Sequence, residues 1–138
     1  MKRIPGAALA LLSLILIATP SWAADQNRLG ADGLHVGEAL FCAAVTDRMP
    51  EGQAESFATG ARVYCWTRVL DGGAGDVIYP VWFHDGREIQ SVELAVEAGH
   101  WRTWSYKTLF PGQQGVWRVE IQNALGELLG SYEFSATE

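Results

Sequence analysis

From residue 39 onward, apolar and polar residues alternate with a period of two, and short runs of turn-forming residues separate the alternating segments. This pattern is typical of β-strands that bury one face, whereas a helix would repeat its apolar positions every three or four residues. Such segments predict strands at 62–70, 77–83, 88–97, 100–109, 116–122 and 127–135, and the segment at 39–46, which is apolar on both faces, predicts a seventh strand that is central or covered. Seven short strands joined by turns predict an all-β fold, an immunoglobulin-like antiparallel β-sandwich, with a small barrel as the alternative.

The connection at 47–60 is the longest between predicted strands, and it contains Pro50 and Gly52. Its residues 53–57 predict a short helical turn. In the strand that follows, alternation places Tyr64, Trp66 and Arg68 on one face and the odd-numbered residues on the other.

Pro80 interrupts the strand predicted at 77–83. Because proline has no N–H to donate to a neighbouring strand, we expect this strand to lie at a sheet edge or to carry a bulge. An edge strand would offer a partner protein a place to add a strand of its own. The Asp85-Gly86 pair that follows predicts a two-residue type I′ hairpin turn.

The first residues predict a secretory signal peptide. Two basic residues precede an apolar run of about 15 residues, and the small residues Ser21 and Ala23 precede a cleavage point. A membrane-spanning helix needs ~20 apolar residues, so this run is too short to be one. We therefore expect a signal peptide at 1–23, a flexible leader at 24–38 and a single domain at 39–138. The protein would be periplasmic or secreted, with no membrane span after cleavage.

Loss of the signal peptide makes the chain more acidic. The full chain has 10 Lys and Arg residues against 16 Asp and Glu residues, and removal of Lys2 and Arg3 leaves 8 against 16. An acidic protein without a basic run repels phosphate backbones and anionic lipid headgroups. We therefore expect neither a nucleic-acid partner nor an anionic membrane surface as partner.

Two cysteines, Cys42 and Cys65, remain in this exported chain. Oxidising compartments favour pairing, so we expect a structural disulfide between them if the geometry allows it. Closing that loop would stabilise the fold by roughly 3 kcal/mol. Two buried free thiols on neighbouring strands are the alternative.

The strand at 100–109 has large side chains on both faces, and both faces cannot be buried equally. Trp101 and Lys107 share one face, while Arg102, Trp104 and Tyr106 share the other. An exposed aromatic ring beside a cation is typical of sugar or peptide recognition, although burial in a core is the commoner use of such residues. We expect a ligand-binding face or edge built around these five residues.

Catalytic and metal-binding patterns are missing from the sequence. Neither an H-x-H nor an H-x-x-x-H spacing occurs, and no serine lies in a nucleophile-elbow motif. We therefore predict no metal, no cofactor and no catalytic residue. The alternative is a small envelope hydrolase whose site is assembled from His84, Asp85, His100 and a carboxylate.

Several short blocks follow one another in a characteristic order. They are F-C-x-x-V at 41–45, V-Y-C-W-T at 63–67, I-x-x-x-W-F at 78–83, W-R-T-W-S-x-K at 101–107, G-x-W-R-V-E-I at 115–121 and G-x-L-L…F at 126–134. In this order and spacing the chain resembles domain-of-unknown-function family 2914, a group of small bacterial domains. That family commonly has a histidine two residues before the tryptophan of the third block, where this chain has Pro80. The resemblance implies a fold and no activity.

Together these patterns predict an exported, non-catalytic binding or interaction module of the cell envelope. Its partner would be an envelope protein or a glycan, recognised through the aromatic and basic face of the strand at 100–109.

Overall fold

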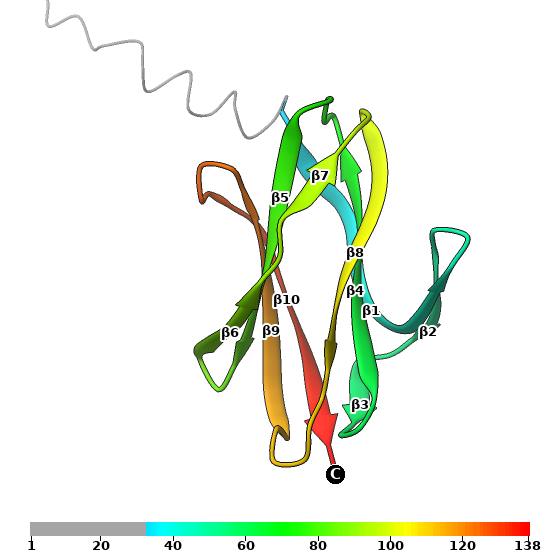
Figure 1. Ribbon diagram of the computed structural model, residues 1–138, viewed down its shortest axis with the longest axis vertical. Helices are drawn as coiled ribbons and strands as arrows, with labels where there is room; N and C mark the ends of the chain where they lie inside the picture. The colour runs from blue at the N-terminus through cyan, green and yellow to red at the C-terminus, as the bar shows by residue number, and fades with distance from the viewer. Residues whose placement is uncertain (1–32) are drawn as a thin grey trace, which may run out of the picture.

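The computed structural model describes residues 33–138, which form a two-layer β-sandwich (Figure 1). Its ten strands are β1 (His35–Thr46), β2 (Met49–Gln53), β3 (Ser56–Ala58), β4 (Arg62–Leu70), β5 (Asp76–His84), β6 (Arg87–Ser91), β7 (Leu94–Val96), β8 (His100–Thr108), β9 (Gly115–Asn123) and β10 (Leu128–Thr137). The predicted all-β sandwich is confirmed. The predicted signal peptide and most of the predicted leader lie outside the described residues. Within residues 33–138, no helix is long and apolar enough to cross a membrane.

The ten strands form two sheets. The first has four strands in the order β2-β1-β4-β8, and the second has the order β3-β10-β9-β5-β6, with β7 also paired to β5. All pairings are antiparallel except that of β3 with β10, which is parallel. β8 is therefore an edge strand of the four-stranded sheet.

Three more strands are present than the alternation predicted. The connection at 47–60 contains β2 and β3, so the helical turn predicted at 53–57 is wrong. In addition, the strand predicted at 88–97 is divided into β6 and β7.

Pro80 causes this division. β5 lies between β9 and the β6–β7 pair, so the prediction that it is an edge strand is wrong, and it offers no free edge to a partner. The Pro80 carbonyl accepts a hydrogen bond from the Val92 N–H at 3.2 Å, but proline has no N–H to return. The hydrogen bond that Pro80 cannot donate would be made at Val92, between β6 and β7. The partner strand is therefore divided at this point. The register shift along β5 lies between Trp82 and Phe83 instead.

The main core lies between the two sheets. Alternate residues of both sheets supply it, and Trp82 and Trp117 are its largest fully buried side chains. Phe134 of β10 packs against both tryptophans, with ring centroids 6.1 and 6.0 Å away, and against Phe41 at 4.6 Å. The Trp82 Nε1–H donates a buried hydrogen bond to Ser105 Oγ at 3.0 Å, which joins the two sheets.

A second, smaller core lies on the outer face of the four-stranded sheet. It consists of Leu40, Cys42 and Trp66, with Val45, Tyr64 and Trp104 packed around them. The β1–β2 hairpin covers this cluster, because β1 leaves β4 after Cys42 and continues only with β2. The tip of the hairpin is anchored where Trp66 Nε1–H donates to the Arg48 carbonyl at 2.9 Å.

Two hairpins have type I′ turns. Asp47 and Arg48 connect β1 to β2 with φ of 50° and 63°, and Asp85 and Gly86 connect β5 to β6 with φ of 49° and 77°. Positive φ at both central residues defines this turn. The turn predicted at Asp85-Gly86 is thus confirmed, whereas the turn at Asp47 lacks the glycine that identifies such turns in a sequence.

The disulfide between Cys42 and Cys65 is absent, and both thiols are free and buried. In the β1–β4 register Cys42 pairs with Tyr64, while Cys65 pairs with Phe41. An offset of one residue points the two side chains to opposite faces of the sheet, so Cys42 lies in the outer core and Cys65 in the main core. Cysteines whose Cβ vectors point apart cannot be bridged without backbone movement.

Candidate functional site

Positive charge is concentrated on one part of this acidic protein. Residues 33–138 contain 7 Lys and Arg residues against 14 Asp and Glu residues. Five of the seven cations lie on β4, on β8 or at the tip of the hairpin that covers them: Arg48, Arg62, Arg68, Arg102 and Lys107. Neither β4 nor β8 contains a carboxylate. This part of the protein is therefore richer in positive charge than the rest of the acidic chain.

Cross-strand pairs between β4 and β8 order the outer face of the four-stranded sheet. Trp66 lies opposite Trp104, and Tyr64 lies opposite Tyr106, with the two tyrosine ring centroids 5.6 Å apart. Pairs of this kind stabilise a sheet. Arg62 stacks on the Tyr106 ring at 4.6 Å, and its interaction with Tyr64 raises the pKa of the guanidinium still further.

The next pair along these strands is unfavourable by itself. Arg68 of β4 lies directly opposite Arg102 of β8. Like charges directly opposite each other on adjacent strands destabilise a sheet. On its other side Arg68 is opposite Glu38 of β1, and Arg68 Nη2 lies 3.6 Å from Glu38 Oε2. Arg102 has no carboxylate partner among the described residues, and its Nη1 donates to Met49 Sδ at 2.8 Å.

These residues line an open cleft of about 510 Å³ on the outer face. Its walls are formed by Glu38, Met49, Trp66, Arg68, His100 and Arg102. Trp66 is almost completely buried, whereas Met49 is 47% exposed. The cleft thus combines two guanidinium groups, one carboxylate and an apolar surface.

The hairpin tip adds a third arginine beside the cleft. The Arg48 guanidinium lies 4.3 Å from the centre of the Trp101 ring and 6.0 Å from that of Trp104. Its Nη2 also donates to the Arg102 carbonyl at the open edge of β8. These contacts fix the hairpin against β8 and place another positive charge beside Arg102.

The residues predicted for the binding face are separated by the fold. Arg102, Trp104 and Tyr106 do share the outer face, and Tyr106 is 51% exposed. Trp101 instead packs against the main core, and Lys107 lies on the inner side, where its Nζ is 4.7 Å from the Phe110 ring. The residues that the sequence predicts for this face therefore form two groups.

Sequence reasoning missed Arg48 and Arg68. Arg68 shares a face of its strand with Tyr64 and Trp66, and the lack of acidic residues in 62–70 and 100–108 was a usable signal. Arg48 reaches the face only because the hairpin folds back over it, and no local pattern predicts that contact.

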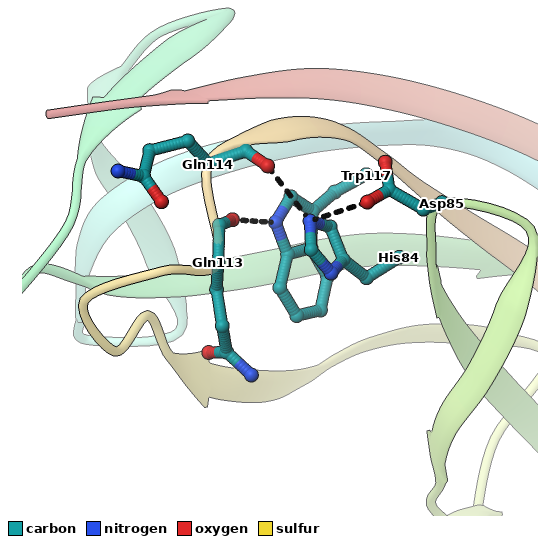
Figure 2. Close-up of polar contacts among 5 residues, drawn as sticks. All are labelled: His84, Asp85, Gln113, Gln114 and Trp117. Carbon is teal, nitrogen blue, oxygen red and sulfur yellow. Dashed lines mark hydrogen bonds and ion pairs between the residues drawn. The ribbon is translucent and has the colours of Figure 1, made fainter.

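The residues of the alternative hydrolase site do not converge. Figure 2 shows His84 lying flat on Trp117, with ring centroids 4.6 Å apart, while its Nε2 is 2.9 Å from the Gln114 carbonyl and 3.5 Å from Asp85 Oδ2. Because a carbonyl only accepts, Nε2 carries the proton, and this histidine fastens the loop that follows β8. His100 begins β8, at the opposite end of that strand from the loop that His84 contacts.

No group of three or more His, Cys, Asp or Glu side chains within residues 33–138 is arranged to hold a metal ion.

Comparison with known proteins gives one family. Residues 76–136 match the family described as "Protein of unknown function (DUF2914)". This match covers the blocks from Ile78 onward and leaves out the two cysteine-containing blocks, so the predicted resemblance is confirmed for the part from β5 to β10. No curated protein matches the chain.

Among solved structures, one similar chain is the alkylpurine DNA glycosylase AlkC of Pseudomonas fluorescens, bound to DNA containing an abasic site analog. The identity is 13% and the TM-score 0.48, and the alignment covers 80% of this chain but 32% of the glycosylase chain. So distant a likeness carries no functional argument. From β5 to β10, this chain is similar to domain-of-unknown-function family 2914.

Proposed function

We propose that this protein is an exported, non-catalytic binding module of the cell envelope, and that it binds a partner protein through the outer face of β4 and β8. The observation that carries the proposal is the concentration of arginines and aromatic rings on that face of an acidic protein. Tyr, Trp and Arg are the residues that contribute most to binding at protein interfaces.

The residues of this proposed face differ from those that the sequence predicted. Arg102, Trp104 and Tyr106 remain, and Arg68 and Arg62 of β4 join them across the strand pair. Trp101 and Lys107 are left out because their side chains turn toward the other side of the sheet. A partner with an acidic surface complements this set, and its association would be fast at low ionic strength and slower in salt.

Site-specific photo-crosslinking in the producing cells tests the proposal. A photoreactive residue replaces Tyr106 on the proposed face, and a control replaces Ser131, an exposed residue of β10. We expect a discrete crosslinked protein from position 106, and its loss when Arg68→Glu and Arg102→Glu are added. Equal crosslinking from position 131, or crosslinking that survives both charge reversals, would refute docking on this face.

A glycan partner is the second candidate. Tyr106 is about half exposed, with the Arg62 guanidinium over its ring, and sugar rings stack on exposed aromatic side chains. Titration with neutral and uronic-acid oligosaccharides, with tryptophan fluorescence as the readout, distinguishes a glycan partner from a protein partner. Saturable binding of an oligosaccharide that is lost in Tyr106→Ala would favour the glycan.

A further inference from the structure

We infer that the cleft on the outer face is a carboxylate-binding subsite, which receives a Glu or Asp side chain from an acidic segment of the partner protein. This inference rests on the proposed function and names the chemistry that the partner presents. The groups that would hold the carboxylate are the guanidinium groups of Arg68 and Arg102.

The charges that line the cleft are unbalanced by one. Two arginines face a single carboxylate, Glu38, which lies on the β1 side of the cleft and pairs with Arg68. Arg102 makes its one side-chain hydrogen bond to the sulfur of Met49, and a thioether is a weak acceptor. A single negative charge brought to Arg102 would complete the set.

The register of the two strands places Arg68 and Arg102 directly opposite each other, and both line the same cleft. Side chains directly opposite on antiparallel strands have Cβ atoms about 4.5–5.5 Å apart. Each guanidinium offers several N–H donors in a planar fork that matches a carboxylate. Arg68 Nε is buried and has no hydrogen-bond partner within residues 33–138, but the same is true of Arg118 Nε on the other sheet, so the case for the cleft depends on its charges.

The remaining walls favour a monoanion on a short apolar stem. Glu38 repels a second negative charge, which disfavours a phosphate dianion relative to a carboxylate. Met49 and Trp66 supply an apolar surface against which the methylene groups of a Glu side chain can pack. Because the cleft is continuous with the aromatic pairs of the outer face, a protein segment can occupy both at once.

The test is a titration of the whole protein with an acetylated, amidated tetraglutamate peptide, with the tetraglutamine peptide as the neutral control. Nitrogen-detected NMR signals of the Arg68 and Arg102 side chains and of Trp66 Nε1–H report on the cleft. We expect the glutamate peptide alone to shift these signals. Arg102→Gln should weaken its binding at least about tenfold. Arg87→Gln, which removes the same charge from an exposed position on β6, should leave it nearly unchanged.

Arg102→Lys provides a second variant that keeps the charge and loses the planar fork, and intermediate binding is expected. Shifts of equal size with tetraglutamine, or binding that survives Arg102→Gln, would overturn the inference. Tighter binding of inorganic phosphate or of glucuronate than of the peptide would also overturn it, since the anion would then come from another source.

This inference and the proposed function can fail separately. If position 106 crosslinks a partner in a way that depends on Arg68 and Arg102 while the peptide does not bind, the face recognises its partner without a carboxylate in the cleft, and only the subsite is refuted. If the peptide binds at the two arginines while no crosslink depends on them, the subsite stands and docking on the outer face is refuted.

Discussion

The outer faces of the two sheets accommodate arginine in opposite ways. On the six-stranded sheet, Arg118 lies over the Phe83 ring, its Nε is 3.3 Å from Glu120 Oε1, and Glu133 is opposite it on β10. On the four-stranded sheet, Arg68 is opposite Arg102. Stability alone favours the first arrangement, because like charges on adjacent strands repel. In the second arrangement Arg68 and Arg102 share one carboxylate, Glu38, and this is why the proposed binding site is placed there.

The main core between the sheets and the smaller cluster on the outer face of the four-stranded sheet differ in burial. The largest expected effect on stability tests this difference. Trp117→Ala removes a fully buried side chain from the main core, and we expect a loss of about 3–5 kcal/mol in the free energy of unfolding. Trp104→Ala, in the half-buried outer cluster, should cost about 1 kcal/mol. Urea denaturation measures both. Equal losses would mean that the outer cluster is part of the main core.

The two cysteines lie in these two regions, and each should make stability depend on pH to a different extent. Burial raises the pKa of Cys65 in the main core to about 12 from its ordinary 9.0, and burial also raises the pKa of Cys42 in the outer core. Above pH 9 the unfolded thiols ionise while the folded ones stay protonated, so the folded state is progressively disfavoured. We expect stability to be constant below pH 9 from this source and to fall by about 1.4 kcal/mol per pH unit for Cys65 between 9 and 12.

Cys65→Ala should reduce that slope more than Cys42→Ala does. A thiol reagent should label neither cysteine in the folded protein and both after denaturation. Fewer than two reactive thiols in the protein denatured without reductant would instead support a disulfide between Cys42 and Cys65.

The hydrogen bond that joins the sheets offers a smaller effect. Ser105→Ala leaves the buried Trp82 N–H without an acceptor and should cost about 1–3 kcal/mol. Ser131→Ala on the exposed side of β10 is the matched control and should change stability by less than about 0.5 kcal/mol. Thermal unfolding followed by near-ultraviolet circular dichroism measures the difference. Similar midpoints for both variants would show that water satisfies Trp82.

The smallest expected effect has opposite signs on the two sheets. Arg102→Glu places a carboxylate opposite Arg68, and we expect stabilisation by about 0.2–1 kcal/mol together with loss of carboxylate binding. Arg118→Glu, which places a third carboxylate beside Glu120 and Glu133, should destabilise by a similar amount. If both charge reversals destabilise the protein equally, Arg68 and Arg102 do not repel each other appreciably. That result would contradict the charge imbalance on which the proposed subsite rests.

Much of the fold was predictable because it depends on local patterns. Alternation identified the strands of both sheets, and the Asp85-Gly86 turn followed from its residues. β3 was not predictable, since three residues such as Ser56–Ala58 form a strand only because β10 provides a parallel partner 79 residues away. Pro80 was predicted to interrupt its own strand, but β5 is continuous and the interruption lies in its partner, between β6 and β7.

The candidate site was predictable only in part. A strand pattern assigns Arg102 and Tyr106 to one face, but the register with β4 decides that Arg68 lies opposite Arg102. The disulfide failed for the same reason, because one residue of register determines whether Cys42 and Cys65 share a face. Local patterns in the sequence predict the individual strands. The register between two strands, which brings site residues together, depends on segments that are distant in the sequence.

The turn at Asp47 and Arg48 has one further consequence. Both residues have a left-handed backbone, which glycine adopts without the strain that a side chain brings. Arg48→Gly would therefore keep the hairpin and relax its turn while removing the guanidinium from Trp101. At this position one substitution can remove the charged group and leave the hairpin in place. Arg48 is therefore a suitable first position for changing the charge of the outer face of β4 and β8.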